Sequence, residues 1–347
     1  MIVGLPNTGA SESDWEYCEK ALIAHSRTFA IPIALLPPEL KRAVTSAYLL
    51  CRIADTVEDT AEWNSDRKTV LYAGLLAVME QGVPCSSFTK LMVNAPGGRT
   101  DERELLMSLS QVMAVYRDLD PELQRTSTCW IAELVRGMDL YGHRPPDAEG
   151  FTVLSSVADL ERYCYFVAGT IGHLLTAAFE RELGASLHPR QVAILRANAE
   201  AFGAALQLVN ILRDFGSDLT RGMCFVPREL LAREGLTPRD LVSAEHRPRV
   251  ERCLAPLFAL AHRRLRQALE YALALPETAS AVRSFCLVPV WLAVASLARC
   301  QKDPEAYYRG EKVKLSREQV AQLVTEVGLI GKDNARIVAH YEALVER

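Results

Sequence analysis

The chain has 347 residues, of which 49% are apolar and 24% are charged. This apolar fraction is enough for a large buried core, so a chain that is disordered throughout is excluded. The 39 Lys and Arg residues against 43 Asp and Glu residues leave a formal charge of −4. That balance excludes a global electrostatic attraction to nucleic acid or to an anionic membrane.

Nine cysteines are present, an odd number, and no two of them form a Cys-x-x-Cys pair. Most fall inside apolar helical patterns, where a free Cys behaves as a small hydrophobic residue. We therefore expect reduced thiols rather than disulfides or a structural zinc site, and a cytoplasmic location. The N-terminal residues carry no basic region followed by a long apolar run, so no secretory signal is predicted.

Apolar residues recur at helical spacing along most of the chain, and alternating strands bounded by turn pairs are absent. In residues 39–62 they form one stripe, and Pro37 and Pro38 precede it as prolines often do at a helix start. Further helices are predicted over residues 101–117, 121–141, 159–183, 189–219, 238–272, 276–300, 316–327 and 332–346. The expected loops are residues 94–100 and 142–150. With no repeat and no evident linker, we predict one all-α domain over residues 1–347.

The most membrane-like stretch is residues 285–298, which hold 14 residues interrupted by Pro289 and Ser296. About 20 apolar residues are needed to span a bilayer. We therefore predict a buried core helix here and no transmembrane segment. Peripheral association with a membrane is left open.

The most informative residues are Asp55, Glu58 and Asp59, which share one face of a helix within about one turn. Three carboxylates this close repel one another unless a cation lies between them. Mg²⁺ suits this arrangement, because it prefers oxygen ligands and completes its coordination with water and substrate phosphates. A chance cluster at a solvated helix end is the alternative for this segment taken alone.

A second aspartate pair, Asp214 and Asp218, has the same i, i+4 spacing and follows a helix with a largely apolar face over residues 202–212. Two facing pairs on antiparallel helices can hold Mg²⁺ over a diphosphate and neutralise charge that develops as a C–O bond ionises. Guanidinium groups suit phosphate oxygens. Each arginine taken singly is better explained by an ordinary surface or ion-pair role, so only their combination favours phosphate binding. The candidate arginines are Arg27, Arg52 and Arg213.

Small residues at one-turn spacing occur in the flanking helical segments. They are Ala168 with Gly172, and Gly203 with Ala204. Such residues leave room beside a helix, so they are compatible with the wall of a tunnel for a prenyl chain. Close packing between two helices explains them equally well, and both interpretations stay open.

Four motifs in this order resemble the squalene and phytoene synthases, the family of head-to-head prenyl synthases. They are residues 26–29 (SRTF), 48–59 (YLLCRIADTVED), 163–169 (YCYFVAG) and 207–214 (QLVNILRD). The resemblance covers about residues 15–320. One departure is Ser217, which stands where the family usually carries an acidic residue before Asp218.

The resemblance implies an isoprenoid synthase fold, with one large helical domain around a central cavity. It implies that Mg²⁺ at the acidic residues Asp55, Glu58, Asp59, Asp214 and Asp218 helps to expel diphosphate from one of two prenyl diphosphates. It assigns a base or cation-stabilising role to Tyr48 and Tyr163, with a core aromatic as the alternative for Tyr48. The substrate-binding residues that it implies are Ser26, Arg27, Phe29, Arg52, Gln207, Asn210, Arg213 and Phe285.

The C-terminal part most resembles the squalene synthases of this family. Residues 284–289 (SFCLVP) match one of their elements, and residues 310–317 (GEKVKLSR) resemble the basic loop that closes over NADPH. Within this loop the resemblance assigns cofactor binding to Lys312, Lys314 and Arg317, while Ser316 stands where a basic residue is expected. A solvated basic surface is the alternative. No Gly-x-Gly-x-x-Gly motif is present, so NADPH would bind without a Rossmann unit.

The predicted activity is therefore that of a farnesyl-diphosphate farnesyltransferase of the squalene synthase type. Two farnesyl diphosphates would give presqualene diphosphate, and NADPH would reduce its rearranged cation to squalene. The alternatives are a phytoene, dehydrosqualene or hydroxysqualene synthase, and outside these a non-catalytic helical scaffold. A head-to-tail prenyltransferase is disfavoured, because DTVED is not a DDxxD motif. The chain ends at Arg347 without the membrane tail of eukaryotic squalene synthases, which favours a soluble or membrane-associated bacterial type. Sterol, hopanoid and carotenoid pathways all stay open.

Overall fold

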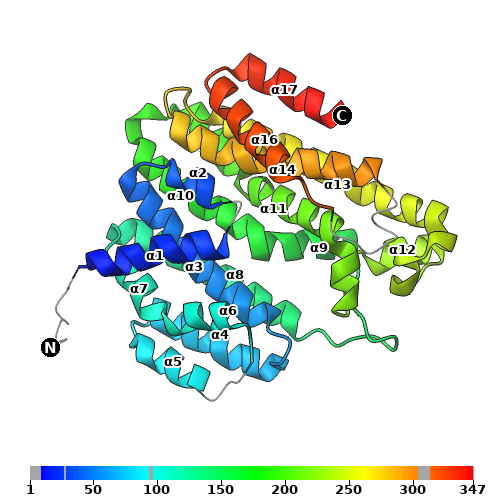
Figure 1. Cartoon of the computed structure of the whole chain (residues 1–347), viewed down its shortest axis with the longest axis horizontal. Helices are drawn as coiled ribbons and strands as arrows, with labels where there is room; N and C mark the ends of the chain where they lie inside the picture. Colours follow the sequence, from blue (N-terminus) through cyan, green and yellow to red (C-terminus); the bar gives the residue numbers. More distant parts are fainter. Residues whose placement is uncertain (1–8, 27–28, 94–96, 304–312, 347) are drawn as a thin grey trace. The chain divides into compact units, whose positions relative to one another are not determined.

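The computed structural model describes residues 9–26, 29–93, 97–303 and 313–346, and most of them are helical (Figure 1). The prediction of an all-α chain is confirmed. The chain divides into two compact units, Met1–His143 with Ala177–Glu182, and Arg144–Thr176 with Leu183–Arg347. That residues 1–347 form a single domain around a central cavity stays a prediction.

The first unit is built from the helices that precede residue 143 and from part of α10. In chain order they are α1 (Glu12–His25), α2 (Ala30–Ala34), α3 (Pro38–Asp59), α4 (Ser65–Glu80), α5 (Cys85–Val93), α6 (Thr100–Met107), α7 (Leu109–Arg117) and α8 (Pro121–Gly142). Helix α3 lies at the centre, in contact with α1, α2, α4, α6, α7 and α8.

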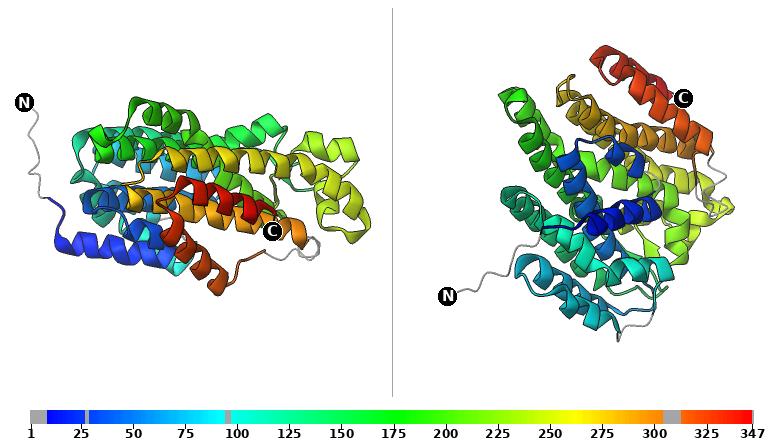
Figure 2. Two further views of the ribbon diagram at one scale, coloured as in Figure 1. Left: turned by 90° about the horizontal axis from the view of Figure 1, so that it is seen from above. Right: turned by 60° about the vertical axis from the view of Figure 1, so that its left-hand side comes forward.

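The second unit contains the longest helices of the chain. Its α-helices are α9 (Val157–Cys164), the larger part of α10 (Thr170–Leu183), α11 (Pro189–Thr220), α12 (Arg228–Glu234), α13 (Arg247–Ala274), α14 (Ser280–Lys302), α16 (Arg317–Ile330) and α17 (Asn334–Glu346). A π-helical turn, η1 (Tyr165–Gly169), joins α9 to α10, and the 3₁₀ turns are η2 (Gly184–Ser186), η3 (Pro238–Val242) and η4 (Ala244–His246). Helices α11, α13 and α14 contact one another side by side, and α16 and α17 pack on α14 (Figures 1 and 2).

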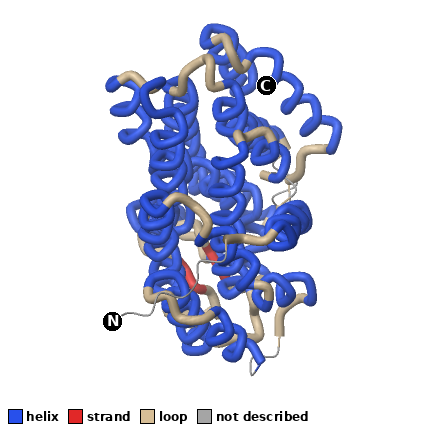
Figure 3. The backbone as a smooth tube through the Cα atoms, turned by 90° about the vertical axis from the view of Figure 1, so that its left-hand side faces the viewer, coloured by secondary structure: helices blue, strands red, loops and turns tan. Residues whose placement is uncertain are grey.

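Two short strands also belong to the second unit. They are β1 (Thr152–Val153) and β2 (Met223–Cys224), paired in parallel and shown in red in Figure 3. Strands of two residues are too short for an alternating pattern, so the sequence carried no signal for them.

Three predicted helices differ from the structure. The helix expected over residues 159–183 is interrupted by the π-helical turn η1 between α9 and α10. The helix expected over residues 101–117 is divided at Ser108 into α6 and α7. The helix expected over residues 238–272 begins with η3 and η4, and continuous α-helix starts only at Arg247. Pro248 in the first turn of α13 explains this boundary, because proline lacks the N–H that a helix interior requires.

Helix α14 is the predicted core helix, but it is longer than the apolar run suggested. It spans 23 residues and continues through Pro289. Its length and composition, like those of α11, would suffice to cross a membrane. In the structure, 78% of the apolar window of α14 is buried, and 56% of that of α11. Such burial is typical of the core helices of a soluble protein, so the two helices are weak evidence for a membrane span.

All nine cysteines are free, and six of them are buried. The prediction of thiols without disulfides is therefore confirmed. Burial raises the pKa of Cys51 and Cys164, which favours the uncharged thiol. These thiols accordingly serve as small packing groups.

Candidate active site

In the first unit, the central helix α3 carries one polar stripe. Tyr48, Arg52, Asp55 and Asp59 follow one another at spacings of four, three and four residues, which places them on the same face. Most of the residues between them belong to the core, and Leu49, Ile53 and Val57 are 0% exposed. Helix packing therefore holds the acidic residues on a rigid backbone.

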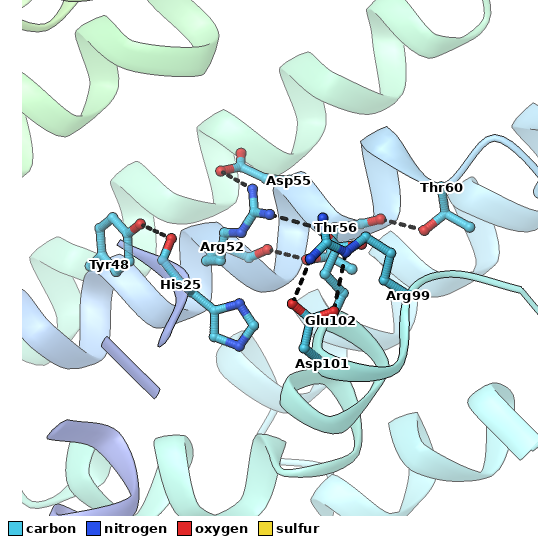
Figure 4. A network of polar contacts seen from close by, with 9 residues as sticks. All are labelled: His25, Tyr48, Arg52, Asp55, Thr56, Thr60, Arg99, Asp101 and Glu102. Carbon is cyan, nitrogen blue, oxygen red and sulfur yellow. Dashed lines mark hydrogen bonds and ion pairs between the residues drawn. The ribbon is translucent and has the colours of Figure 1, made fainter. Parts of the chain in front are cut away.

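Arg52 is held by two carboxylates of this unit (Figure 4). Its Nη2 donates to Oε1 of Glu102 on α6 at 3.0 Å, and its Nη1 lies 4.0 Å from Oδ2 of Asp55. The third donor, Nε, is buried and has no hydrogen-bond partner among the described residues. A buried donor without a partner is costly, so the guanidinium retains capacity for an anionic ligand.

Asp55 lies in an environment that disfavours its charge. Burial raises its pKa from 3.8 to about 7, the charge of Arg52 lowers it, and Asp59 raises it further. About 41% of the side-chain surface is nevertheless exposed, so a ligand can reach the carboxylate. A divalent cation would offset both the burial and the repulsion from Asp59, and the oxygen donors of Asp55 and Asp59 suit Mg²⁺.

Around Tyr48, the structure gathers two further predicted residues. The Tyr48 hydroxyl donates to the backbone carbonyl of His25 at 3.1 Å, and its ring centroid lies 6.1 Å from that of Phe29. Burial raises the Tyr48 pKa, and a hydrogen bond with the Ser26 side chain lowers it. The Oγ of Ser26 also accepts from the backbone N–H of Phe29 at 2.9 Å. Arg27 lies outside the described residues.

In the second unit, helix α11 carries the other polar stripe. Gln207, Asn210, Asp214 and Asp218 are spaced three, four and four residues apart and so share one face. His188 caps the helix with its side chain, and Pro189 occupies its first turn, which explains where it begins. Like α3, helix α11 is central to its unit, in contact with η1, α9, α13 and α14.

Both aspartates of α11 are paired with arginines. Arg213 donates to Asp214 from Nε at 3.1 Å and from Nη2 at 2.8 Å, and this hydrogen bonding raises the Arg213 pKa. Arg221 donates from Nη2 to Oδ1 of Asp218 at 2.7 Å, and Asp218 is 7% exposed. The cations are thus already positioned next to the acidic residues, as phosphate binding beside a metal would require.

Ser217, the departure from the family pattern, turns its hydroxyl to its own helix. Its Oγ donates to the backbone carbonyl of Asp214 at 2.9 Å. Such back-bonding of Ser is common within helices. In this conformation Ser217 does not act as a substitute ligand.

Tyr163 and Phe285 are both part of the core of the second unit. Tyr163 on α9 is 5% exposed, and its ring centroid lies 4.9 Å from that of Phe225. Phe285 on α14 is 3% exposed. Tyr163 lies just before the π-helical turn η1, a type of irregularity that is frequent at functional sites.

The small residues of α10 and α11 are explained by close helix packing. A Cβ at Gly172 would lie 1.8 Å from the carbonyl oxygen of Ala199, and a Cβ at Gly203 would lie 1.9 Å from that of Ala168. The two backbones thus touch where these glycines occur. The alternative, a tunnel wall at this point, is not supported for this glycine pair.

Of the three predicted cofactor residues, Lys314 and Arg317 are exposed and Lys312 lies outside the described residues. Ser316 has a local role, because its Oγ accepts from the backbone N–H of Gln319 at 3.1 Å and caps α16. A basic residue at this position could not provide that cap.

The described residues contain no group of three or more His, Cys, Asp or Glu side chains arranged to hold a metal ion. Asp55, Glu58 and Asp59 therefore do not converge on one point in this conformation. Glu58 as a metal ligand stays a prediction, as do the two aspartate pairs. A Mg²⁺ ion bound by one or two carboxylates, with water and substrate oxygens, is compatible with this finding.

Sequence reasoning missed two residues of the site, Glu102 and Arg221. Arg221 follows Asp218 by three residues, which is a usable signal on a helix. Glu102 is 50 residues from Arg52 in the chain, and only the packing of α6 on α3 brings them together.

Comparison with known proteins identifies the family of this chain. The profile of the family described as squalene/phytoene synthase matches residues 22–319. The chain belongs to the squalene/phytoene synthase family. This membership confirms the resemblance that the four motifs indicated.

Individual relatives extend the comparison. The squalene synthase of Schizosaccharomyces pombe is 28% identical over 92% of this chain and 67% of its own length. Squalene synthase 1 of Arabidopsis thaliana is 28% identical over 90% of this chain and 71% of its own. A squalene synthase of Saccharomyces cerevisiae is 27% identical over 86% of this chain and 64% of its own length. The chain thus spans about two thirds of the length of these curated relatives.

Solved structures show the same fold. The complex of TcSQS with the ligand BPH1237 is 25% identical, with a TM-score of 0.81 over 96% of this chain and 92% of that chain. A dehydrosqualene synthase in complex with a ligand is 21% identical, with a TM-score of 0.58 over 92% of this chain and 96% of that chain. The predicted isoprenoid synthase type of fold is thereby confirmed.

Proposed function

We propose that this chain is a squalene synthase, a prenyltransferase that joins two farnesyl diphosphates head to head and reduces the product with NADPH. The observation that carries the proposal is the repeated arrangement on α3 and α11. Each helix is central to its unit and presents two aspartates one turn apart with an arginine beside them. The curated relatives named squalene synthase support the same activity.

Asp55, Asp59, Asp214 and Asp218 are the proposed Mg²⁺ ligands. When bound, Mg²⁺ would neutralise the negative charge that grows on the departing diphosphate. The raised pKa of Asp55 supports this assignment, because burial and the nearby Asp59 disfavour its charge by more than Arg52 offsets, and a bound cation would reverse that. Arg52 would bind phosphate oxygens through its unpartnered Nε, with Glu102 holding the guanidinium in place.

The tyrosines are proposed to have different roles. The Tyr48 hydroxyl is bonded to the His25 carbonyl and its ring lies near that of Phe29, so we assign it to positioning His25 and Phe29. Tyr163, beside η1, is the better candidate for stabilising a carbocation or for accepting a proton. The apolar side chains around it exclude water, which would otherwise trap the cation early.

NADPH is the proposed reductant, with Lys314 and Arg317 as cations for its phosphates. Their exposure and their position before and at the start of α16 are compatible with this role. The alternative products, dehydrosqualene, hydroxysqualene and phytoene, need no hydride. A cytoplasmic location stays the expectation, with peripheral membrane association left open.

The test is to incubate purified protein with farnesyl diphosphate and Mg²⁺, with and without NADPH, and to identify the products by mass. We expect squalene only with NADPH, and presqualene diphosphate without it. Dehydrosqualene or hydroxysqualene in both samples would contradict the reductive step. If neither farnesyl nor geranylgeranyl diphosphate is converted, a non-catalytic scaffold is favoured instead.

A further inference from the structure

The second unit contains a pocket of about 400 Å³ that none of the predicted site residues lines. Ala298, Arg299 and Lys302 line it from the C-terminal end of α14, while Gln319, Gln322 and Leu323 line it from α16. Their spacings place each set of three on one helix face. The pocket is therefore formed by the packing of α16 on α14 and is not a surface irregularity of one loop.

The charges of this pocket favour an anion. Within the described part of the chain, the side chains of Arg299 and Lys302 form no ion pair. Asp303 also lines the pocket and opposes an anion, but it engages in another interaction. Among the described lining residues there are thus two cations and one carboxylate. Lys314 and Arg317, on either side of the lining residue Leu315, add exposed positive charge nearby.

The uncharged lining residues indicate what kind of anion fits. Ala298 and Leu323 provide apolar walls, and the amides of Gln319 and Gln322 provide both donors and acceptors. An aromatic heterocycle with ring nitrogens and an amino group can use such walls and amides, while its phosphate meets the cations. A volume of about 400 Å³ is in the range of sites for small ligands.

Helix α14 also connects this pocket to the candidate active site. Arg213, which holds Asp214, lies near Cys300, because α11 and α14 pack against each other. Cys300 lies one residue after Arg299, on a different face of the helix. A ligand with two ends separated by a linker can therefore occupy the pocket with one end and leave the other free to reach the Asp214 region around the end of α14.

We propose that this pocket binds the phosphorylated adenosine end of the reduced pyridine dinucleotide, with Arg299 and Lys302 holding its 2′-phosphate. The inference rests on the proposed function, because it specifies where the NADPH of that function binds. It assigns the phosphate to two residues of α14 that no motif of the sequence indicated. It further explains how a chain without a Rossmann unit could prefer the 2′-phosphorylated dinucleotide.

The first test is direct binding, which needs no catalysis. The probe is adenosine 2′,5′-bisphosphate, titrated calorimetrically into the full-length protein. We expect the double variant Arg299→Ala/Lys302→Ala to bind it at least about 10-fold more weakly, because two charge-assisted contacts are lost. Ala298→Trp, which fills the pocket and removes no charge, should weaken binding as well.

The matched control is Lys332→Ala/Arg336→Ala. It removes one Arg and one Lys charge, as the test variant does, but at exposed positions. Lys332 lies between α16 and α17, Arg336 lies on α17, and neither lines the pocket. This control should bind the probe as the unaltered protein does. An equal loss of affinity in both double variants would show that only the overall charge matters, and it would overturn the proposal. Absence of binding by the unaltered protein would overturn it as well. Inorganic phosphate binding as tightly as the nucleotide would show a simple anion site and overturn it too.

The second test separates this inference from the proposed function. In Arg299→Ala/Lys302→Ala, the KM for NADPH should rise at least about 10-fold and approach the KM for NADH, while the KM for NADH changes little. Diphosphate release from farnesyl diphosphate without NADPH should stay unchanged. An unaltered KM for NADPH would overturn the pocket assignment and leave the proposed function intact. Absence of diphosphate release from the unaltered protein would instead contradict the proposed function.

Discussion

Arg52 shows how single side chains of this site combine stability with function. Its ion pair with Glu102 and its proximity to Asp55 hold it in place, yet its buried Nε has no partner among the described residues. Asp55 similarly has its pKa raised to about 7 by burial. Both groups lower the stability of the ligand-free protein. Such unfavourable groups are typical of residues whose interactions are completed when a ligand binds.

Replacing Asp55 should therefore separate activity from stability. We expect Asp55→Asn to lower kcat/KM for farnesyl diphosphate by about 10³-fold or more, because a metal ligand contributes several kcal/mol to transition-state stabilisation. The midpoint of thermal unfolding should not fall, since the substitution removes an unfavourable buried charge. Steady-state kinetics and calorimetry measure the two effects. A variant that unfolds at room temperature would instead show that Asp55 is structural.

Tyr48 offers the contrasting case. Tyr48→Phe removes a hydrogen bond to the His25 carbonyl, which costs about 1 kcal/mol of stability. We expect kcat to fall by less than about 10-fold, because the hydroxyl is engaged with the backbone. Tyr163→Phe is the matched comparison and should lower kcat by at least about 100-fold if it stabilises a cation or accepts a proton. Equal effects of both substitutions would contradict these different roles.

At the scale of the elements, the π-helical turn η1 and the start of α10 pack closely on α11 because two glycines there have no side chain. Gly172 and Gly203 allow backbone contact between them, since an added Cβ would meet a carbonyl oxygen below 2 Å. Helix α11 in turn carries the aspartate pair of the second unit. This close packing therefore helps to fix the helix that carries Asp214 and Asp218, the proposed metal ligands.

Gly172→Ala should accordingly destabilise the protein by about 1–3 kcal/mol or more, because the helices must move apart. Denaturant unfolding measures this effect. The control is Gly328→Ala on α16, where nothing lies within 4 Å of the added Cβ. That substitution should be neutral or stabilise the protein by up to about 1 kcal/mol, since Ala favours helix. Equal effects at the two positions would show that the close approach does not matter.

At the scale of the whole molecule, the proposed metal site couples ligand binding to stability. A ligand that binds only the folded protein stabilises it by about 2.7 kcal/mol at 100 times its dissociation constant. We expect Mg²⁺ with inorganic diphosphate to raise the midpoint of thermal unfolding by a few degrees, and a chelator to reverse the shift. Mg²⁺ alone should have a smaller effect, because substrate oxygens complete its coordination.

Differential scanning calorimetry of the full-length protein measures these shifts. The double variant Asp55→Asn/Asp214→Asn is the control and should show no response to Mg²⁺ with diphosphate. A shift of the same size in this variant would mean that the ligands bind elsewhere on the molecule.

The sequence by itself determined the helical class, the family and the aspartate pairs. Helical periodicity and short motifs are local properties, so they can be read without coordinates. Tertiary structure decided what depends on distant contacts: the partnership of Glu102 with Arg52, the close packing at Gly172 and Gly203, and the pocket beside Arg299. The sequence left the small residues open between tunnel and packing, because a glycine pattern does not reveal which neighbour lies against it. Only the position of the opposing backbone resolved that choice.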